Sequence, residues 1–152
     1  MKKSNFNETD KTSSGFLLWQ VTTLWQREIK TALEEVNLSH SGFVLLATLL
    51  WFKEQDVVVT QTTLIEHTKL DKMTVSKSLK KLEKEELVLR AENEADTRAK
   101  TIVLTDDGEA LAMKSVKIVE EVDQKFFSLF SQKEKAEFNR LFLRLLKDED
   151  QN

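Results

Sequence analysis

The sequence contains no cysteine and no proline, and it is poor in histidine and glycine. Without cysteine the chain has no disulfide, no thiol-based redox switch, no cysteine nucleophile and no thiolate metal ligand. Its two histidines, His40 and His67, are far apart and show no local ligand pattern, so a metal site would have to be carboxylate-rich, and we predict none. Three glycines provide no glycine-rich phosphate loop. The absence of proline, against a usual share of about 5%, favours long uninterrupted helices.

Long apolar runs are also missing. The longest, FVLLATLLWF at residues 43–52, has about half of the roughly 20 residues that a transmembrane helix needs. The first residues, MKKSNFNETDKTSS, carry two lysines but no apolar stretch behind them, which argues against a secretion signal. We therefore predict a flexible leader over residues 1–12 and a cytoplasmic protein. A length of 152 residues with 32% charged residues is typical of one globular domain.

The first half of the chain has apolar residues at helical spacing. Ser13 or Ser14 can cap a long first helix, and Ser39 can cap a second helix that is apolar on nearly all sides and should be buried. After a loop with at most one short strand, Thr60 can cap a short helix, QTTLIEHT, and Asp71 can cap a fourth. The apolar stripe of the first helix comprises Leu18, Val21, Trp25, Ile29, Leu33 and Val36.

The pattern changes after Lys84. Two β-branched and apolar runs, LVLRA and KTIVL, flank the polar segment ENEADTRA, which predicts a β-hairpin. Thr105 then opens a helix with acidic residues in its first turn, and SQKE at residues 131–134 is a capping box that starts a last helix. The sequence therefore predicts a mostly α fold with one small hairpin, in the order helices, hairpin, two helices.

The segment DKMTVSKSLKKLEK, residues 71–84, has two chemically different faces. At about 100° per residue, Val75, Leu79 and Leu82 fall within one narrow arc and should face the core. Lysines can reach phosphates, and Ser, Thr and Met can lie close to base edges. The residues on or beside the opposite face are Met73, Thr74, Ser76, Lys77, Lys80, Lys81 and Lys84.

A solvated helix face is the plain alternative for these lysines, but the distribution of charge argues against it. Residues 69–81 carry a net charge of +4, whereas the whole chain carries −3. Such segregation is what a local nucleic-acid footprint requires. A short helix, a tight turn at KLD and this second helix form a helix-turn-helix, and a hairpin directly after it makes a winged helix. We interpret the segment as a DNA-recognition helix.

From about Leu38 to Gly108 the sequence resembles the multiple-antibiotic-resistance regulator (MarR) family of winged-helix repressors. The matching segments are VTQTTLIEHTKLDKMTVSKSLKKLEKEELVLR and DTRAKTIVLTDDG. The second contains the family's Asp-x-Arg signature, here Asp96 to Arg98, and its Leu-Thr-x-x-Gly motif, here Leu104 to Gly108. The resemblance implies one continuous domain: a winged helix-turn-helix DNA-binding lobe over residues 38–104, flanked by dimerisation helices over residues 13–37 and 105–147.

The resemblance also implies roles for individual residues. Thr74, Ser76 and Lys77 would enter the major groove, and Arg98 would reach the adjacent minor groove or its phosphates, supported by Asp96. The plain alternative for the last two is a surface ion pair worth less than about 1 kcal/mol. The complete set of predicted DNA-binding residues is Gln61, Thr62, Lys72, Met73, Thr74, Ser76, Lys77, Lys80, Lys81, Arg98 and Lys100, with Asp96 as the support of the wing.

Members of this family act as homodimers, in which two recognition helices about 34 Å apart read a palindromic operator. The alternative for the flanking apolar helices is that they complete a monomer's core. The resemblance further implies a ligand-responsive repressor whose effector is a small aromatic or anionic molecule. Trp19, Trp25, Phe43 and Trp51 are candidates for the effector pocket, although aromatics at helical spacing are also typical of an ordinary core. We predict no cofactor and no membrane partner.

The sequence departs from the family pattern at two places. Glu86 stands where relatives have glycine just past the recognition helix, which implies a strained or different helix end. Glu92 and Glu94 near the wing tip would repel phosphates, so we expect the wing to contact less DNA than is usual in the family.

Two other functions compete with DNA binding. Ser78 to Lys81, SLKK, fits the Ser-x-x-Lys pattern of penicillin-binding enzymes, but the companion motifs of those enzymes are missing. The second alternative is a winged-helix module that binds another protein and not DNA. The acidic net charge supports it, and the lysine face speaks against it.

Overall fold

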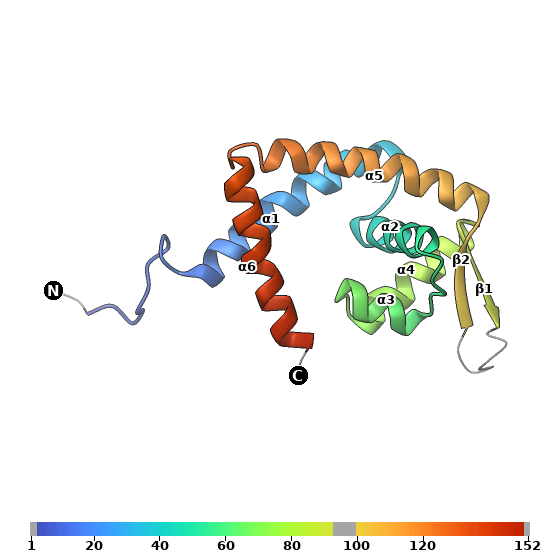
Figure 1. Ribbon diagram of the computed structural model, residues 1–152, viewed down its shortest axis with the longest axis horizontal. Helices are drawn as coiled ribbons and strands as arrows, with labels where there is room; N and C mark the ends of the chain where they lie inside the picture. The colour runs from blue at the N-terminus through green and yellow to red at the C-terminus, as the bar shows by residue number, and fades with distance from the viewer. Residues whose placement is uncertain (1–2, 93–99, 151–152) are drawn as a thin grey trace. The chain divides into compact units, whose positions relative to one another are not determined.

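The computed structural model describes residues 3–92 and 100–150, and the chain forms two compact units, residues 1–119 and 120–152. The prediction of a mostly helical chain with one hairpin is confirmed (Figure 1). The elements are α1 (Ser14–Leu33), a 3-10 turn (Glu34–Val36), α2 (His40–Glu54), α3 (Gln61–Thr68), α4 (Lys72–Lys84), β1 (Val88–Glu92), β2 (Lys100–Leu104), α5 (Asp106–Phe126) and α6 (Gln132–Asp150).

The helices begin at the residues that the sequence predicts as caps. Of the two serines considered for α1, Ser13 is the cap, and its hydroxyl accepts a hydrogen bond from the backbone of Phe16 at 3.3 Å. Ser39 caps α2, Thr60 caps α3 and Asp71 caps α4 through their side-chain oxygens. These side chains satisfy backbone N–H groups that the first turn of a helix leaves without partners.

Four helical segments end in a residue with a left-handed backbone, and none of these residues is glycine. They are Asn37, Asp56, Lys69 and Glu86, with φ between 53° and 65°. At Glu86 the N–H bonds to the carbonyl of Glu83 at 3.0 Å, which closes the last turn of α4. A left-handed L-residue costs on the order of 1–2 kcal/mol, so Glu86 terminates the helix in the conformation that glycine would adopt more easily.

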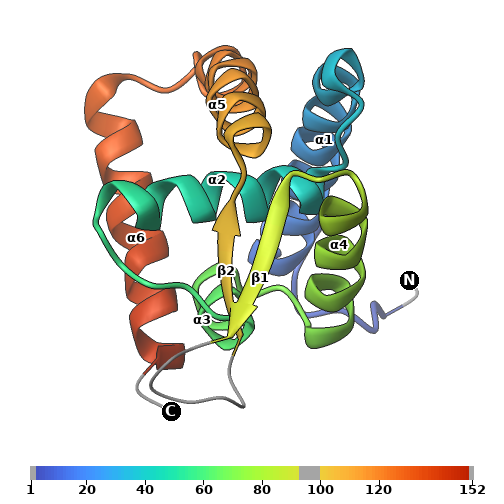
Figure 2. The same ribbon diagram turned by 90° about the vertical axis from the view of Figure 1, so that its right-hand side faces the viewer.

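Helix α2 is the centre of the first unit, where it packs against α3, α4 and β2 (Figure 2). Leu45, Leu46 and Leu49 on α2 are buried, as the apolar run predicts. Trp51 on the same helix is an exception, since 54% of its surface remains exposed. Helix α4 completes this core with the predicted arc of Val75, Leu79 and Leu82, all buried.

The hairpin pairs β1 with β2 in antiparallel register, with Val88 opposite Leu104. On its other edge β2 meets the segment before α3, because the N–H of Ile102 donates to the carbonyl of Val59 at 2.8 Å. An isolated bridge between Thr60 and Thr101 continues this contact, and it is what remains of the short strand considered from the sequence.

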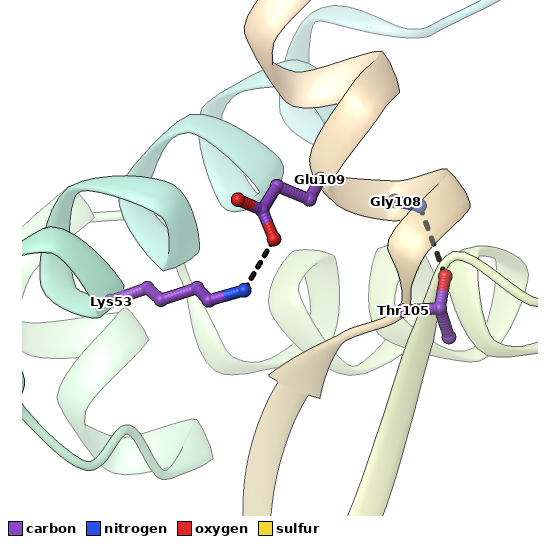
Figure 3. A network of polar contacts seen from close by, with 4 residues as sticks. All are labelled: Lys53, Thr105, Gly108 and Glu109. Carbon is purple, nitrogen blue, oxygen red and sulfur yellow. Dashed lines mark hydrogen bonds and ion pairs between the residues drawn. The ribbon is translucent and has the colours of Figure 1, made fainter.

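The first turn of α5 is fixed against the turn that follows α4, and Figure 3 shows the bond between Thr105 and Gly108 within that first turn. The N–H of Thr105 donates to the carbonyl of Leu87 at 3.1 Å, and its hydroxyl donates to the carbonyl of Glu86 at 2.8 Å. The same hydroxyl accepts from the N–H of Gly108 at 3.0 Å. A Cβ on Gly108 would lie 1.9 Å from the carbonyl oxygen of Leu87. The glycine is therefore required by a backbone contact and not by an unusual φ.

The stripe of α1 is buried only in part. Ile29 and Leu33 are fully buried, whereas Leu18 and Val21 nearer its start are exposed. No helix within residues 3–92 and 100–150 combines the length and apolar character needed to cross a membrane.

In the second unit, Ser131 and Glu134 form the predicted capping box at the start of α6. Phe138 lies at the centre of an aromatic cluster, 5.5 Å from the rings of Phe127 and Phe130 and 4.3 Å from that of Phe142. Helix α6 also exposes large apolar side chains, among them Leu141, Leu143, Leu145 and Leu146.

Replacing Gly108 by alanine should destabilise the protein by about 1–3 kcal/mol, because the new methyl group must displace the Leu87 carbonyl. Urea denaturation followed by circular dichroism measures this loss. Gly15→Ala in α1 is the matched control, since a Cβ there meets no atom within 4 Å. Equal stability of the two variants would contradict the close contact at Gly108.

Candidate nucleic-acid interface

Helix α4 presents the two faces that its sequence predicts. While Val75, Leu79 and Leu82 are buried, Met73 is 82% exposed on the other side. Thr74 and Ser76 are half-buried at the edges of this outer face. The predicted lysines of the helix are all exposed: Lys72, Lys77, Lys80, Lys81 and Lys84. The core thus holds one side of α4 and leaves a basic side facing solvent.

The start of α4 is held by a hydrogen-bonded pair. The Asp71 carboxylate accepts from both the backbone N–H and the hydroxyl of Thr74, each at 2.8 Å. These hydrogen bonds from the Thr74 backbone and hydroxyl lower the pKa of Asp71 below its ordinary value. Because its hydroxyl hydrogen is committed to Asp71, Thr74 can offer a ligand only its oxygen lone pairs and its methyl group.

Helix α3 and the turn after it place α4. Lys69 ends α3 in the left-handed conformation, and its N–H donates to the carbonyl of Ile65 at 3.0 Å. Leu64 of α3 is buried together with the apolar arc of α4. At the start of α3, Thr62 is exposed and Gln61 is half-buried. Both belong to the predicted DNA-binding set.

A groove of about 420 Å³ runs between the first turn of α2 and one flank of α4. At its wall the hydroxyls of Ser41 and Ser78 are hydrogen-bonded at 2.9 Å, and Lys77 and Lys81 line the α4 side. The sequence analysis missed Ser41 and Ser78 as site residues. They are 37 positions apart, and the SLKK pattern that contains Ser78 indicates nothing about Ser41, so only the packing of α2 on α4 brings them together.

The wing contributes described residues only at its base. Lys100, predicted to contact DNA, is exposed at the start of β2. Arg90 on β1 lies beside α4 with its Nε 3.5 Å from the carboxylate of Glu83, which links the hairpin to the recognition helix. Asp96 and Arg98, which carry the predicted wing contact, lie outside the described residues, as does Glu94.

The four aromatic residues proposed for an effector pocket occupy different places. Trp25 and Phe43 both approach His40, with ring centroids 5.2 Å and 6.5 Å from it. Trp19 is 70% exposed nearer the start of α1, and Trp51 is exposed near the end of α2. None of the four lines the groove beside α4. Among the described residues, no cluster of three or more acidic or histidine side chains could hold a metal ion.

A helix-turn-helix with a buried apolar arc, an exposed basic face and a following hairpin defines a winged helix-turn-helix protein. In agreement, residues 34–122 match the family model of the ArnR1-like winged-helix domain. The chain is 38% identical over 123 residues to YdcH, an uncharacterised HTH-type transcriptional regulator of Bacillus subtilis, covering 81% of this chain and 84% of the relative. The chain belongs to the MarR family of winged helix-turn-helix regulators, which excludes the enzyme alternative.

Solved structures of the same family share the fold. The Staphylococcus aureus MepR–DNA complex matches with a TM-score of 0.79 and 23% identity, covering 90% of this chain and 98% of that one. Bordetella bronchiseptica BpsR, studied for the regulation of its DNA binding by 6-hydroxynicotinic acid, matches with a TM-score of 0.81 and 19% identity, covering 92% and 97%. At these identities the likeness concerns the fold.

Replacing Asp71 by alanine should destabilise the protein at neutral pH, because the first turn of α4 loses its cap. The pKa of Asp71 is lowered in the folded state, so its contribution is present above the ordinary value of 3.8 and is lost as the pH falls through the lower folded value. The urea midpoints of wild type and Asp71→Ala should therefore differ at pH 7 and converge at acidic pH.

Two variants complete this test. Asp71→Asn keeps an uncharged oxygen at the cap and should retain most of the stability with less pH dependence at this site. Asp10→Ala, in the segment before α1, should leave the midpoint unchanged. A difference between wild type and Asp71→Ala that persists undiminished at acidic pH would show that the carboxylate charge is not what caps α4.

Proposed function

We propose that this protein is a transcriptional regulator that binds double-stranded DNA in a sequence-specific manner, as a homodimer on a palindromic operator. The exposed basic face of α4, opposite its buried arc, is the observation that carries the proposal. A helix held in this way can enter the major groove, where lysines contact phosphates and shorter side chains reach base edges. MepR, which shares the fold, was solved bound to DNA.

Within this proposal the residues of α4 divide into two groups. Lys72, Lys77, Lys80 and Lys81 supply the charge that positions the helix on the backbone, and this contact carries no sequence information. Met73, Thr74 and Ser76 supply the contacts to bases. Since the Thr74 hydroxyl donates to Asp71, Thr74 would read a base through its methyl group or by accepting a hydrogen bond, for example from an adenine or cytosine amino group.

Residues outside α4 extend the proposed contact. Gln61 and Thr62 at the start of α3 and Lys100 at the base of the wing are the further described members of the predicted set. The groove beside Lys77 and Lys81 provides two more hydroxyl groups for a backbone phosphate. Arg98, supported by Asp96, remains the proposed minor-groove contact of the wing.

The proposal of a homodimer is supported by apolar side chains that neither unit buries. On α1 these are Phe16, Leu17, Leu18, Trp19, Val21 and Leu24, and on α6 they are Leu141, Leu143, Leu145 and Leu146. Large apolar side chains exposed in such numbers on one helix mark interaction sites. A second copy of the chain is the simplest partner, because a twofold axis also presents two recognition helices to one duplex. Residues 13–37 and 105–147 are the proposed dimerisation helices.

We further propose that a small aromatic or anionic molecule regulates the protein as a repressor. The aromatic residues Trp25 and Phe43 around His40 support such a site at the junction of α1 and α2. BpsR, which shares the fold, is regulated by 6-hydroxynicotinic acid, a molecule of this class. Because the chain has no cysteine, this control cannot use thiol oxidation.

The proposed DNA contact is tested with Lys77→Ala. The variant should bind duplex DNA from upstream of its own gene more weakly. The salt dependence of its affinity should also fall, by the amount that corresponds to about one phosphate contact per protomer. Each lost contact lowers the slope of log K against log salt by about 0.9. Fluorescence anisotropy at several salt concentrations measures both quantities.

Lys11→Ala, which removes an exposed lysine outside the predicted DNA-binding set and the proposed dimerisation helices, is the matched control and should change neither affinity nor slope. If Lys77→Ala behaves like this control, Lys77 is not a phosphate contact. If the wild type binds no DNA at all, the protein-binding alternative takes the place of the regulator proposal.

Charge in the proposed dimer surface should separate the copies. Leu145→Glu on α6, where the leucine is 67% exposed, should shift the protein from dimer to monomer, because an unpaired carboxylate would have to be buried in the interface. Sedimentation equilibrium measures the mass. Leu89→Glu on β1, where the leucine is 56% exposed outside both proposed dimerisation helices, is the control and should leave the dimer intact. A dimer that persists in Leu145→Glu would exclude this face of α6 from the interface.

A further inference from the structure

A second groove, separate from the proposed DNA surface and from the aromatic residues, lies between the end of α2 and the hairpin. It has a volume of about 360 Å³. Its floor is made by buried apolar side chains, Leu49, Val59 and Ile102. Its rim is also apolar, with Val57, Val58 and Val103 exposed, and Val58 is 68% exposed. A volume of this order suits a small organic molecule.

One acidic side chain at this groove has no cationic partner among the described residues. Lys53 at one side is engaged, since its ammonium forms an ion pair with Glu109 at the start of α5 (Figure 3). Asp56 also lines the groove, and no residue in the described part of the chain forms an ion pair or hydrogen bond with its carboxylate. The groove therefore combines an apolar body with one unpaired negative charge.

Backbone acceptors lie on the same side. Ile102 uses its N–H to bond Val59, so the outer edge of β2 carries the backbone groups of residues 102 and 104. Past this bond, the segment before α3 turns away to close the end of α2, where the N–H of Val57 donates to the carbonyl of Phe52 at 2.9 Å. By the same alternation the carbonyl of Leu104, a residue that lines the groove, belongs to this outer edge, and no hydrogen bond to it is described.

We propose that this groove binds a small amphipathic cation, with its apolar body over Leu49 and Ile102 and its ammonium group beside Asp56. A carboxylate and backbone carbonyls can both accept from an ammonium group, and neither can accept from an anion. An anionic ligand would have to displace Glu109 from Lys53 while facing Asp56. A neutral ligand would use the apolar walls but leave the carboxylate unpaired.

The position of the groove gives such a ligand a consequence for DNA binding, and this part of the inference rests on the proposed function. Its walls are α2, the segment that leads into α3, and β2 of the wing. These elements support the recognition helix and the hairpin. A ligand seated between α2 and β2 would favour one distance between these two elements. The affinity for DNA would change if the DNA-bound protein requires a different distance.

The binding itself is tested without DNA, on the full chain, with three probes of similar size: 2-phenylethylammonium, 2-phenylethanol and 3-phenylpropionate. Titrations followed by 15N–1H NMR should show that the cation shifts the amide resonances of residues 57–59 and 101–104. The cation should bind a few-fold more tightly than the alcohol, the scale expected for one exposed ion pair. The anion should bind least.

Two variants assign the contacts. Asp56→Asn suits the left-handed backbone at this position and should abolish the preference for the cation over the alcohol. Val58→Ser should weaken both probes alike, and Asp10→Asn should change nothing. The proposal is overturned by shifts that map elsewhere, by a preference that survives Asp56→Asn, by tighter binding of the anion, or by no shift with any probe at about 10 mM.

Anisotropy titrations of upstream DNA with and without 2-phenylethylammonium then separate this inference from the proposed function. If the protein binds the cation in the groove but binds no DNA, the proposed site stands and its regulatory role is removed. DNA binding with no ligand in the groove would remove the site and leave the regulator proposal intact.

Discussion

The contact between Gly108 and the carbonyl of Leu87 is the constraint on which the arrangement of the first unit depends. It joins the end of the recognition helix, the start of β1 and the first turn of α5 within a few ångströms, and Thr105 bonds across the same point. Lys53 and Glu109 add a link from α2 to the next residue of α5. The start of α5 and the turn that follows α4 thus share one point of attachment, at Glu86 and Leu87.

A second relation connects the core to the basic face. The apolar arc of α4 is anchored on α2, and the opposite side of the same helix must then face outward whatever its charge. Lysines at these outward positions do not affect the packing of the core, so their charge is available for function. Residues 69–81 carry +4 and the whole chain carries −3, so the rest of the chain is acidic, which limits nonspecific attraction to DNA.

Local features could be predicted from the sequence because their causes are local. Ser39, Thr60 and Asp71 cap the helices that they precede, and the spacing of Val75, Leu79 and Leu82 determines which side of α4 is buried. The pairs Ser41–Ser78 and Lys53–Glu109 could not be predicted, because their members are 37 and 56 positions apart and meet only through packing. Gly108 was recognised as part of a family motif, but its reason, a backbone carbonyl from another element, is visible only in three dimensions. The predicted DNA contacts stay predictions, since exposure alone does not assign a ligand.

The clamp at Leu87 and Thr105 closes the base of the hairpin independently of what lies beyond β1 and β2. The pairing of β1 with β2 fixes the positions of residues 92 and 100. The number of residues between them can therefore change without altering this pairing. The length and charge of this connection can thus change while α4 stays where the core has put it.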